Sequence, residues 1–422
     1  MVNIMWDVII IGGGPAGAFC AYLLARNGCS VVLLEKGEKF RYKSCAGGVT
    51  PRALSLLPKV PEEIIEDRPR YLRVFADDVF FEFKLRGEGI LVYRSKFDQW
   101  LRDLAESEGA VVKYNTTAKD IVFANNFVEV KHTQGSEEGK ILVGAFGYSG
   151  HLFKKLGIEP PPYSLAVQRE FKLPEEDIEE VKGAFETYFG AEFCTFGYAW
   201  IFPKSKSRGV SVGIVDKEAK SGLLLKLDYA IKNHPILSKK LRNATLKYVS
   251  KVHVSASVIP YGITKKIYGD RFILVGDAAG IADPISWEGM GPAIISSKVA
   301  TDVILKAIEE NKFDANFLKS YYKKLYNILL RDDTIPALRA SKRVCIDAEF
   351  YSNFNKAMLL CAKEDKKFRE IFIWTFSRER PFKYIDEYVR KKTFCIFKHI
   401  GIRNALRMIS QAFLSKLRKS QE

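Results

Sequence analysis

Three glycines early in the chain have the spacing of a nucleotide-binding turn. Gly12, Gly14 and Gly17 form G-x-G-x-x-G, between a β-branched run at residues 8–11 and an apolar helical pattern. The first glycine permits a tight turn, the second lets backbone approach a pyrophosphate, and the third lets the helix pack against the strand. Glu35 ends the next strand pattern, where a carboxylate binds both ribose hydroxyls and repels a 2′-phosphate. This context predicts a site for the ADP half of FAD or NAD, not NADP, and disfavours a turn without a ligand.

A second carboxylate follows a buried strand pattern at residues 272–275. Asp277 lies in the segment GDAAG at residues 276–280, at the carboxyl end of that strand, where open α/β sheets bind ligands. It either accepts hydrogen bonds from a ribityl chain or only forms a turn. Farther on, Gly289 and Gly291 open a helix, whose first N–H groups would stabilise an anionic ring placed against them. We expect the two distant glycine turns to hold one flavin dinucleotide.

A cysteine lies in a third glycine-containing segment. Cys45 is followed by Ala46, Gly47 and Gly48, in a loop that is expected to bring backbone close to a ligand. This segment alone does not distinguish a reactive thiol from a packed, inert cysteine.

Three aromatic residues alternate along one strand pattern. Tyr198, Trp200 and Phe202 fall on the same face because strand side chains alternate with period two. They either line an apolar tunnel or form an ordinary sheet core. Pro203 is expected to end this strand or to place it at a sheet edge.

The composition is that of a folded protein with two or three domains. The chain has 422 residues, of which 47% are hydrophobic and 27% are charged. No window of 18 uncharged apolar residues occurs, so we expect no membrane-spanning helix. The first residues lead directly into a strand pattern without a basic region or cleavage site. We therefore expect no signal peptide and a cytoplasmic protein.

Positive charge gathers in the last quarter of the chain. The net charge is +16, and residues 313–422 carry 24 Lys and Arg against 12 Asp and Glu. This surface is either solvated or attracted to an anionic membrane or lipid substrate. No nucleic-acid recognition motif is visible, so we expect no nucleic-acid partner.

The seven cysteines do not form a metal-binding pattern. They are scattered, without a C-x-x-C pair, and the five histidines are dispersed. We therefore expect neither a zinc site nor an iron–sulfur cluster.

Between these motifs, the residue patterns predict alternating strands and helices. Residues 71–86 alternate like an exposed hairpin, and a helix after residue 94 has a buried stripe of Phe97, Leu101, Leu104 and Ala105. Residues 163–254 are mostly strand-like with one acidic helix. Beyond residue 313 the pattern is mostly helical.

These residues together resemble the FAD-binding superfamily that includes aromatic hydroxylases, and within it the geranylgeranyl reductase family. The superfamily resemblance rests on GGGPAG at residues 12–17, Glu35 and Gly276-Asp277. Cys45-x-Gly47-Gly48 and Tyr198-x-Trp200-x-Phe202-Pro203 point to the prenyl reductases. Further matches are Arg94 with Phe97-Asp98, Pro284, and Gly289-x-Gly291. The resemblance spans roughly residues 1–310.

The resemblance implies an α/β fold like that of p-hydroxybenzoate hydroxylase. We expect a Rossmann-type FAD-binding domain of three layers, two of strands and one of helices (ββα), an antiparallel β-sheet substrate domain and a C-terminal helical region. The FAD-binding domain is assigned to residues 1–70, 95–160 and 255–312. The substrate domain is assigned to residues 71–94 and 161–254, and the basic helical domain to residues 313–422.

The resemblance also implies a cofactor, a substrate and site residues. The cofactor is FAD, and the reaction saturates isolated double bonds of geranylgeranyl chains, as in archaeal membrane glycerophospholipids. Tyr198, Trp200 and Phe202 are expected to contact the prenyl chain, and Cys45 is the catalytic candidate. Arg94 either contacts the cofactor or forms a surface salt bridge. The residues assigned to FAD are Gly12, Gly14, Pro15, Ala16, Gly17, Glu35, Lys36, Ala46, Gly47, Gly48, Arg94, Asp277, Gly289, Met290 and Gly291.

One segment departs from the hydroxylase relatives. They carry Asp-Gly where this chain has Phe146-Gly147. The departure puts direct use of NADPH in doubt, so the expected electron donor is ferredoxin or NAD(P)H. Two other functions stay open: a flavin monooxygenase, which Phe146 disfavours, and an electron-transfer flavoprotein for quinone, which the cysteine spacing disfavours. We also expect peripheral contact with the inner face of the cell membrane.

Overall fold

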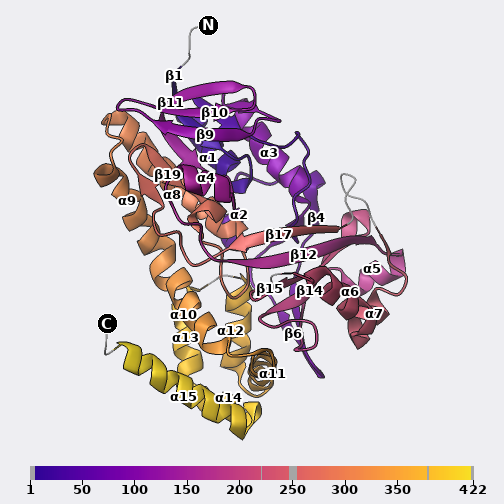
Figure 1. The fold of residues 1–422 in the computed structure, drawn as a ribbon. Coiled ribbons are helices and arrows are strands. Elements are labelled where there is room, and N and C mark those ends of the chain that lie inside the picture. The colour runs from indigo at the N-terminus through magenta and orange to yellow at the C-terminus, as the bar shows by residue number, and fades with distance from the viewer. Residues whose placement is uncertain (1–4, 220, 247–253, 378–379, 420–422) are drawn as a thin grey trace.

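A computed structural model describes residues 5–219, 221–246, 254–377 and 380–419. Figure 1 shows a mixed α/β molecule in which the N-terminal sheet and the C-terminal helices lie at opposite ends. A second sheet lies beside the helices between these two ends. Among the described helices, none combines the length and the apolar character that crossing a membrane requires.

The first sheet contains the strands predicted on either side of the N-terminal glycine turn. Its order is β18-β19-β11-β1-β2-β8, and the five strands from β19 to β8 are parallel. Such strands are buried on both faces, which explains their continuous apolar runs. The bounds are β1 Met5–Ile11, β2 Val31–Leu34, β8 Val111–Lys113, β11 Gly135–Gly144, β18 Tyr268–Gly269 and β19 Phe272–Leu274.

Helices and a small meander cover this sheet. Helix α1 (Pro15–Arg26) contacts both α3 (Arg94–Ser107) and α8 (Met290–Glu309). Strands β9 (Ala118–Phe123) and β10 (Val128–His132) pair antiparallel with each other, and β10 pairs with the first half of β11. The expected ββα layers are therefore confirmed. Helix α4 (Gly150–Lys155) follows β11, where only a turn was expected.

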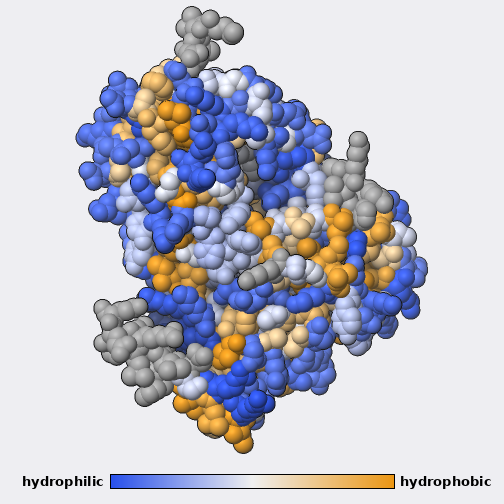
Figure 2. Space-filling model, in the orientation of Figure 1, coloured by the Kyte–Doolittle hydropathy of each residue, from blue (hydrophilic) through white to orange (hydrophobic). Residues whose placement is uncertain are grey.

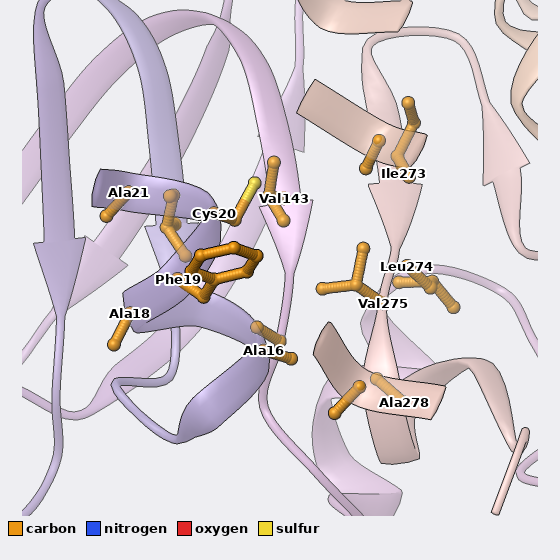
Figure 3. Close-up of a cluster of buried hydrophobic side chains, with 14 of the residues drawn as sticks. Ala16, Ala18, Phe19, Cys20, Ala21, Val143, Ile273, Leu274, Val275 and Ala278 are labelled. Carbon is orange, nitrogen blue, oxygen red and sulfur yellow. The ribbon is translucent and has the colours of Figure 1, made fainter. Parts of the chain in front are cut away.

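The core of this domain lies between α1 and the sheet. Figure 3 shows Phe19 and Cys20 of α1 next to Val143 of β11, with Ile273 of β19 on the other side of β11. All four side chains are fully buried. The predicted stripe of α3 is buried at Phe97, Leu101 and Ala105, while Leu104 is only half-buried.

The second sheet is larger than the sequence patterns indicated. Its order is β16-β12-β15-β14-β13-β5-β6, and β17 also pairs with β12. All pairs are antiparallel except β5 with β13, which is parallel. The bounds are β5 Tyr71–Ala76, β6 Val79–Lys84, β12 Tyr163–Lys172, β13 Ala184–Phe189, β14 Gly197–Lys204, β15 Gly209–Asp216, β16 Thr245–Leu246 and β17 Val254–Pro260.

Three features of this sheet differ from the expectations. The hairpin β5–β6 is exposed on one face only, because Phe75 and Phe83 are buried while Phe80 is 43% exposed. Helices α6 (Leu223–Asn233) and α7 (Pro235–Lys240) follow the expected acidic helix α5 (Glu175–Val181). Residues 247–253 of the expected strand region lie outside the described residues. The domain division itself remains a prediction.

Pro203 neither ends its strand nor lies in an edge strand. Strand β14 continues to Lys204 and lies between β13 and β15. The proline is tolerated because pairing with β13 already stops at Ile201 opposite Glu186. No ladder hydrogen bond is therefore lost on that side.

Helices cover both faces of the second sheet, as the apolar alternation requires. Helices α5 to α7 pack on one face, and the C-terminal helices pack on the other with Tyr198 and Trp200. The C-terminal region is helical as predicted. The bounds are α9 Ala315–Leu325, α10 Ile335–Val344, α11 Ala348–Glu364, α12 Lys366–Ser377, α13 Phe382–Lys391, α14 Thr393–Ile400 and α15 Ile402–Lys419, and a π-helical turn at Tyr326–Thr334 joins α9 to α10.

A disulfide joins two of these helices. Cys361 of α11 and Cys395 of α14 are bonded across 34 residues of sequence. No cysteine spacing in the sequence predicts this pairing. A short third sheet, β3-β7-β4, begins directly after the loop that contains Cys45. Its bounds are β3 Gly48–Val49, β4 Ile65–Asp67 and β7 Ile90–Val92. The short helix α2 spans Pro51–Leu54.

Candidate active site

The first glycine turn is held by direct backbone contacts. A Cβ atom on Gly17 would lie 1.9 Å from the carbonyl oxygen of Gly12, and one on Gly12 would lie 2.4 Å from that of Ala145. Gly12 also has φ of +104°, a left-handed conformation that favours glycine. Helix α1 begins after Gly14 without a side-chain cap. Its first N–H groups are therefore oriented toward an anion site.

The predicted ribose acid lies directly beside this turn. Glu35 is 2% exposed, and its Oε2 accepts a hydrogen bond from the Gly13 N–H at 2.9 Å. Its Oε1 accepts one from the Gly37 N–H at 2.7 Å and pairs with Arg41 Nε at 3.0 Å. These contacts hold the carboxylate at the end of β2. A carboxylate has about four acceptor positions, so capacity remains for ribose hydroxyls.

Two guanidinium groups gather over the same turn. A Cβ atom on Gly14 would lie 3.7 Å from Arg41 Nη2 and 3.8 Å from Arg94 Nη2. Arg94 forms two hydrogen bonds with Asp98, at 2.6 and 2.9 Å, and its side chain is only 10% exposed. Arg94 is therefore not a surface salt-bridge partner. Arg41, which the sequence analysis missed, adds a second positive charge where a pyrophosphate would lie.

The second glycine turn contacts the first. A Cβ atom on Gly276 would lie 2.9 Å from Cβ of Ala16, and Ser297 of α8 donates a hydrogen bond to the Ala16 carbonyl at 2.7 Å. Figure 3 places Ala16 and Ala278, one from each turn, in the same buried cluster. The structure thus brings together motifs that lie about 260 residues apart in the sequence, because β1 and β19 both flank β11.

Asp277 lies in an electropositive environment. Burial raises the pKa of its carboxyl group, while the nearby charges of Lys43 and Arg94 lower it, and burial dominates. Among the described residues, none donates a hydrogen bond to the Asp277 carboxylate. A partly buried carboxylate of this kind fits a ligand that donates hydroxyl groups.

Lys43 and Arg94 respond to the same site in opposite ways. Burial, reinforced by Arg94, lowers the pKa of the Lys43 amine, which donates a hydrogen bond to Ser257 at 2.8 Å. Burial also lowers the pKa of the Arg94 guanidinium, but its interactions with Asp98 and Cys45 raise that pKa by more. The net effect is a raised pKa for Arg94. Lys43 and Arg94 therefore place positive charge next to Asp277, where an anionic group of a ligand could pair with them.

The helix expected to support the flavin ring begins where predicted. Gly289 is the N-cap residue of α8, and Met290 is its first residue and buried. The Gly291 N–H donates to Glu288 Oε1 at 2.5 Å, so a neighbouring side chain engages this amide. A Cβ atom on Gly289 would lie 3.4 Å from Asp277 Oδ1. The N-terminus of α8 and the second glycine turn are thus adjacent.

The cysteine loop connects this site to the second sheet. The Cys45 sulfur accepts a hydrogen bond from the Gly47 N–H at 3.4 Å. A Cβ atom on Gly47 would lie 1.9 Å from the Val92 carbonyl, so glycine is required there. One on Gly48 would lie 3.5 Å from the Phe202 ring. The Ala46 carbonyl accepts a hydrogen bond from the buried Lys204 at 2.5 Å. Lys204 was not singled out from sequence.

An apolar cavity of about 500 Å³ lies between the second sheet and the C-terminal helices. Tyr198 lines it and donates a hydrogen bond to the Ser286 carbonyl at 2.7 Å. Trp200 and Phe202 do not line the cavity, but they lie on the same face of β14 and belong to the same apolar cluster, against which Ala46 also packs. The cavity and the cysteine loop therefore border one cluster.

One cavity residue has an unusual backbone. Trp287 has φ of +52°, which is rare for a bulky residue. Its indole N–H donates to Ser164 at 2.7 Å, and its ring lies 5.5 Å from that of Tyr198. Such strain concentrates at functional sites. Trp287 was not predicted as a site residue, because no residue type signals a left-handed tryptophan.

The remaining assigned residues differ in position. Pro15 is the first residue of α1 and is buried, as a helix-opening proline should be. Lys36 follows Glu35 but its side chain is exposed. Phe146, which stands where the hydroxylase relatives carry an acid, packs against Phe153 with ring centroids 5.2 Å apart. The FAD assignments of individual residues stay predictions.

The residues present fit FAD. Arg41, Arg94 and the uncapped N-terminus of α1 could hold a pyrophosphate. Glu35 could hold a ribose, and Asp277 could accept hydrogen bonds from a ribityl chain. These features define an FAD-binding flavoprotein of the Rossmann type, and FAD is its cofactor. The family model "FAD binding domain" matches residues 5–164.

The relatives narrow this class to one family. Digeranylgeranylglycerophospholipid reductase 2 of Methanopyrus kandleri is 31% identical over 75% of this chain and 81% of that protein. The digeranylgeranylglycerophospholipid reductase of Methanocaldococcus jannaschii is 26% identical over 76% of this chain and 83% of that protein. The chain belongs to the digeranylgeranylglycerophospholipid reductase family.

Solved structures agree with the fold. A geranylgeranyl bacteriochlorophyll reductase-like protein of Thermoplasma acidophilum has a TM-score of 0.72 at 20% identity, covering 99% of this chain and 98% of that one. A halogenase solved with FAD has a TM-score of 0.69 at 15% identity, covering 99% of this chain and 93% of that one.

Proposed function

We propose that this protein is an FAD-dependent reductase that saturates C=C bonds in geranylgeranyl chains of membrane glycerophospholipids. One observation supports the proposal most strongly. The apolar cluster that contains Tyr198 borders the cavity of about 500 Å³, and Ala46 of the cysteine loop packs against the same cluster. A volume of this size is typical of a site for a small or flexible apolar ligand. The cavity is lined by aromatic and aliphatic side chains with a few polar groups, and a prenyl chain is stabilised by such apolar contacts.

The chemistry needs a hydride at one alkene carbon and a proton at the other. Reduced FAD, when bound, supplies the hydride. Helix α8 directs its N-terminus toward the Asp277 turn, where its dipole stabilises negative charge. The apolar lining excludes water and thereby strengthens that interaction. Cys45 is the proposed proton donor. Tyr198 is the proposed contact inside the cavity, and Trp200 and Phe202 are the proposed contacts for the part of the chain between the cavity and Ala46.

Two observations favour a reductase over the other functions. Phe146 replaces the acid of the hydroxylase relatives, so a turn for NADPH-linked oxygenation is missing there. An electron-transfer flavoprotein for quinone would need an iron–sulfur cluster, and two of the seven cysteines are instead joined as Cys361–Cys395. The proposed donor is ferredoxin, with NAD(P)H as the alternative.

The product mass tests this function directly. The protein is loaded with FAD, reduced anaerobically with dithionite, and incubated with digeranylgeranylglycerophospholipid. We expect the lipid to gain two hydrogens for each double bond saturated. Unchanged lipid, together with rapid reduction of a quinone, would favour the electron-transfer function instead.

We further propose that helices α14 and α15 contact an anionic membrane surface. Phe394 is 84% exposed and Ile402 82%, and Leu406 and Ile409 follow Ile402 on the same helix face. Figure 2 shows apolar surface gathered at the end of the molecule where Figure 1 labels these helices. Basic side chains surround it, among them the exposed Lys398 and Arg403. Exposed apolar residues flanked by cations are typical of interfacial helices.

Vesicle sedimentation tests this contact. Wild-type protein is expected to bind phosphatidylglycerol vesicles and not phosphatidylcholine vesicles. The double variant Ile402→Ser/Leu406→Ser should lose binding. Leu225→Ser, which removes an equally exposed leucine from α6, is the matched control and should bind like wild type. Equal binding by both variants would place the contact elsewhere.

A further inference from the structure

The cavity has chemically different ends. Its inner end is formed by buried groups such as Tyr198 and by the loop that carries Trp287, close to the second glycine turn. Among the described residues that line it, the charged ones are Arg343 of α10 and Asp386 and Arg390 of α13. The side chain of Arg343 is 36% exposed and that of Arg390 is 61% exposed. These two side chains therefore mark a solvent-facing rim.

The charges at this rim are not balanced. Arg343 Nη2 donates a hydrogen bond to Asp386 Oδ1, and Arg390 Nε lies 3.3 Å from Asp386 Oδ2. The single carboxylate of Asp386 thus pairs with two guanidinium groups, which leaves one net positive charge among these three residues. Each guanidinium has five N–H donors, so most of them are not engaged by Asp386. Asp386, which is 12% exposed, orients both side chains at the cavity opening.

An apolar cavity with a cationic rim matches an amphipathic anion with a long apolar chain. Guanidinium groups bind phosphate oxygens through paired hydrogen bonds and do so better than ammonium groups. Ile409 of α15 lines the same cavity and is also 53% exposed, so the rim adjoins the proposed membrane-contacting face. A lipid leaving the membrane there would meet the two arginines with its polar end and the cavity with its chain.

We propose that Arg343 and Arg390 bind the phosphate of the lipid headgroup while one prenyl chain occupies the cavity. This inference rests on the proposed reductase function and assigns the specificity for a phosphorylated substrate to these two residues. Asp386 is a positioning residue, because it pairs with both guanidinium groups and holds them at the cavity opening. A free phosphate or glycerol phosphate would be recognised by the same chemistry.

Paired substrates test the proposal. Reduction of digeranylgeranylglycerophospholipid and of geranylgeraniol is measured in neutral detergent micelles, where membrane charge plays no part. Arg343→Gln and Arg390→Gln are each expected to raise KM for the phospholipid about tenfold, the loss of a charge-assisted hydrogen bond. Neither should change kcat, FAD content or KM for geranylgeraniol. Arg339→Gln, an exposed arginine of α10 away from the cavity, is the matched control.

Competition by soluble phosphates shows which part of the headgroup is recognised. Glycerol phosphate should compete with the phospholipid in wild type and lose this effect in Arg390→Gln. Inhibition by inorganic phosphate that equals inhibition by glycerol phosphate would identify phosphate alone as the recognised group. Equal KM changes for both substrates, or none, would overturn the proposal. If wild type reduces neither substrate, the proposed function fails and not the headgroup assignment alone.

Discussion

At the scale of residues, the FAD site depends on a few charges placed against backbone. Glu35 is fixed by two N–H groups and by Arg41, and Arg94 is fixed by Asp98. The acid and the glycines were predictable because their spacing has a mechanical meaning. The role of Arg41 was not predictable, because its guanidinium reaches Gly14 only through the path that the loop after β2 takes in the fold. Arg102 is a similar case: it is fully buried and donates to the Gly13 carbonyl at 2.6 Å.

Asp277 gives a prediction about pH. Because burial raises its pKa in the folded protein, the ionised carboxylate opposes folding at pH values above that pKa. The FAD-free variant Asp277→Asn should therefore unfold at a higher temperature than wild type at pH 8. The difference should shrink as the pH falls through the raised pKa, where wild type becomes protonated. Thermal melts between pH 8 and pH 5 measure this difference.

The same variant should bind FAD about tenfold more weakly, the value of one hydrogen bond to a charged group. Fluorescence titration of FAD provides this second readout. Asp103→Asn, which neutralises an exposed acid of α3, is the control and should change neither property. A difference in melting temperature that grows toward acid pH would contradict the assigned sign.

At the scale of elements, the site exists because helix α1 lies almost in contact with the turn before it. Gly17→Ala places a Cβ 1.9 Å from the Gly12 carbonyl, so α1 must shift away from β1. We expect a loss of about 1 to 3 kcal/mol in the free energy of unfolding and nearly complete loss of bound FAD. Gly150→Ala in α4, where nothing lies within 4 Å, is the matched control and should retain FAD.

The disulfide between α11 and α14 gives a second prediction at this scale. Its 34-residue separation implies about 3 to 4 kcal/mol of stabilisation by restricting the unfolded chain. Cys395→Ala should therefore lower the melting temperature, and a reducing agent should lower wild type to the same value.

A second cysteine variant controls for this result. Cys345→Ala removes a free cysteine and should remain sensitive to the reducing agent. If reduction leaves the melting temperature of wild type unchanged, the disulfide does not hold these helices together.

The strand and helix patterns near the N-terminus were predictable because both β1 and β2 are buried on two faces. The second sheet was harder to predict. Its hairpin β5–β6 joins the sheet through a parallel pair with β13, more than 100 residues away, and no local pattern signals such a contact. Helices α6 and α7 were missed because they interrupt a region that is otherwise strand-like.

At the scale of the whole molecule, three parts of the chain meet around one apolar cluster. The cysteine loop contributes Ala46, the second sheet contributes Tyr198, and the C-terminal helices supply most of the cavity lining. The sequence indicated the first two by their motifs. The third had only a helical pattern and positive charge, and its role in the cavity depends on packing between distant segments.

The most direct test of a reductase that works through this cavity is a single anaerobic turnover. FAD bound to the protein is reduced, geranylgeranyl phospholipid is added, and the return of the yellow flavin absorbance is compared with the number of double bonds lost. Saturation of one double bond for each flavin reoxidised is the predicted result, and Ala340→Phe, which narrows the cavity, should slow it without loss of FAD. Flavin that stays reduced in the presence of the lipid, in a protein that still binds FAD, would contradict the proposed function.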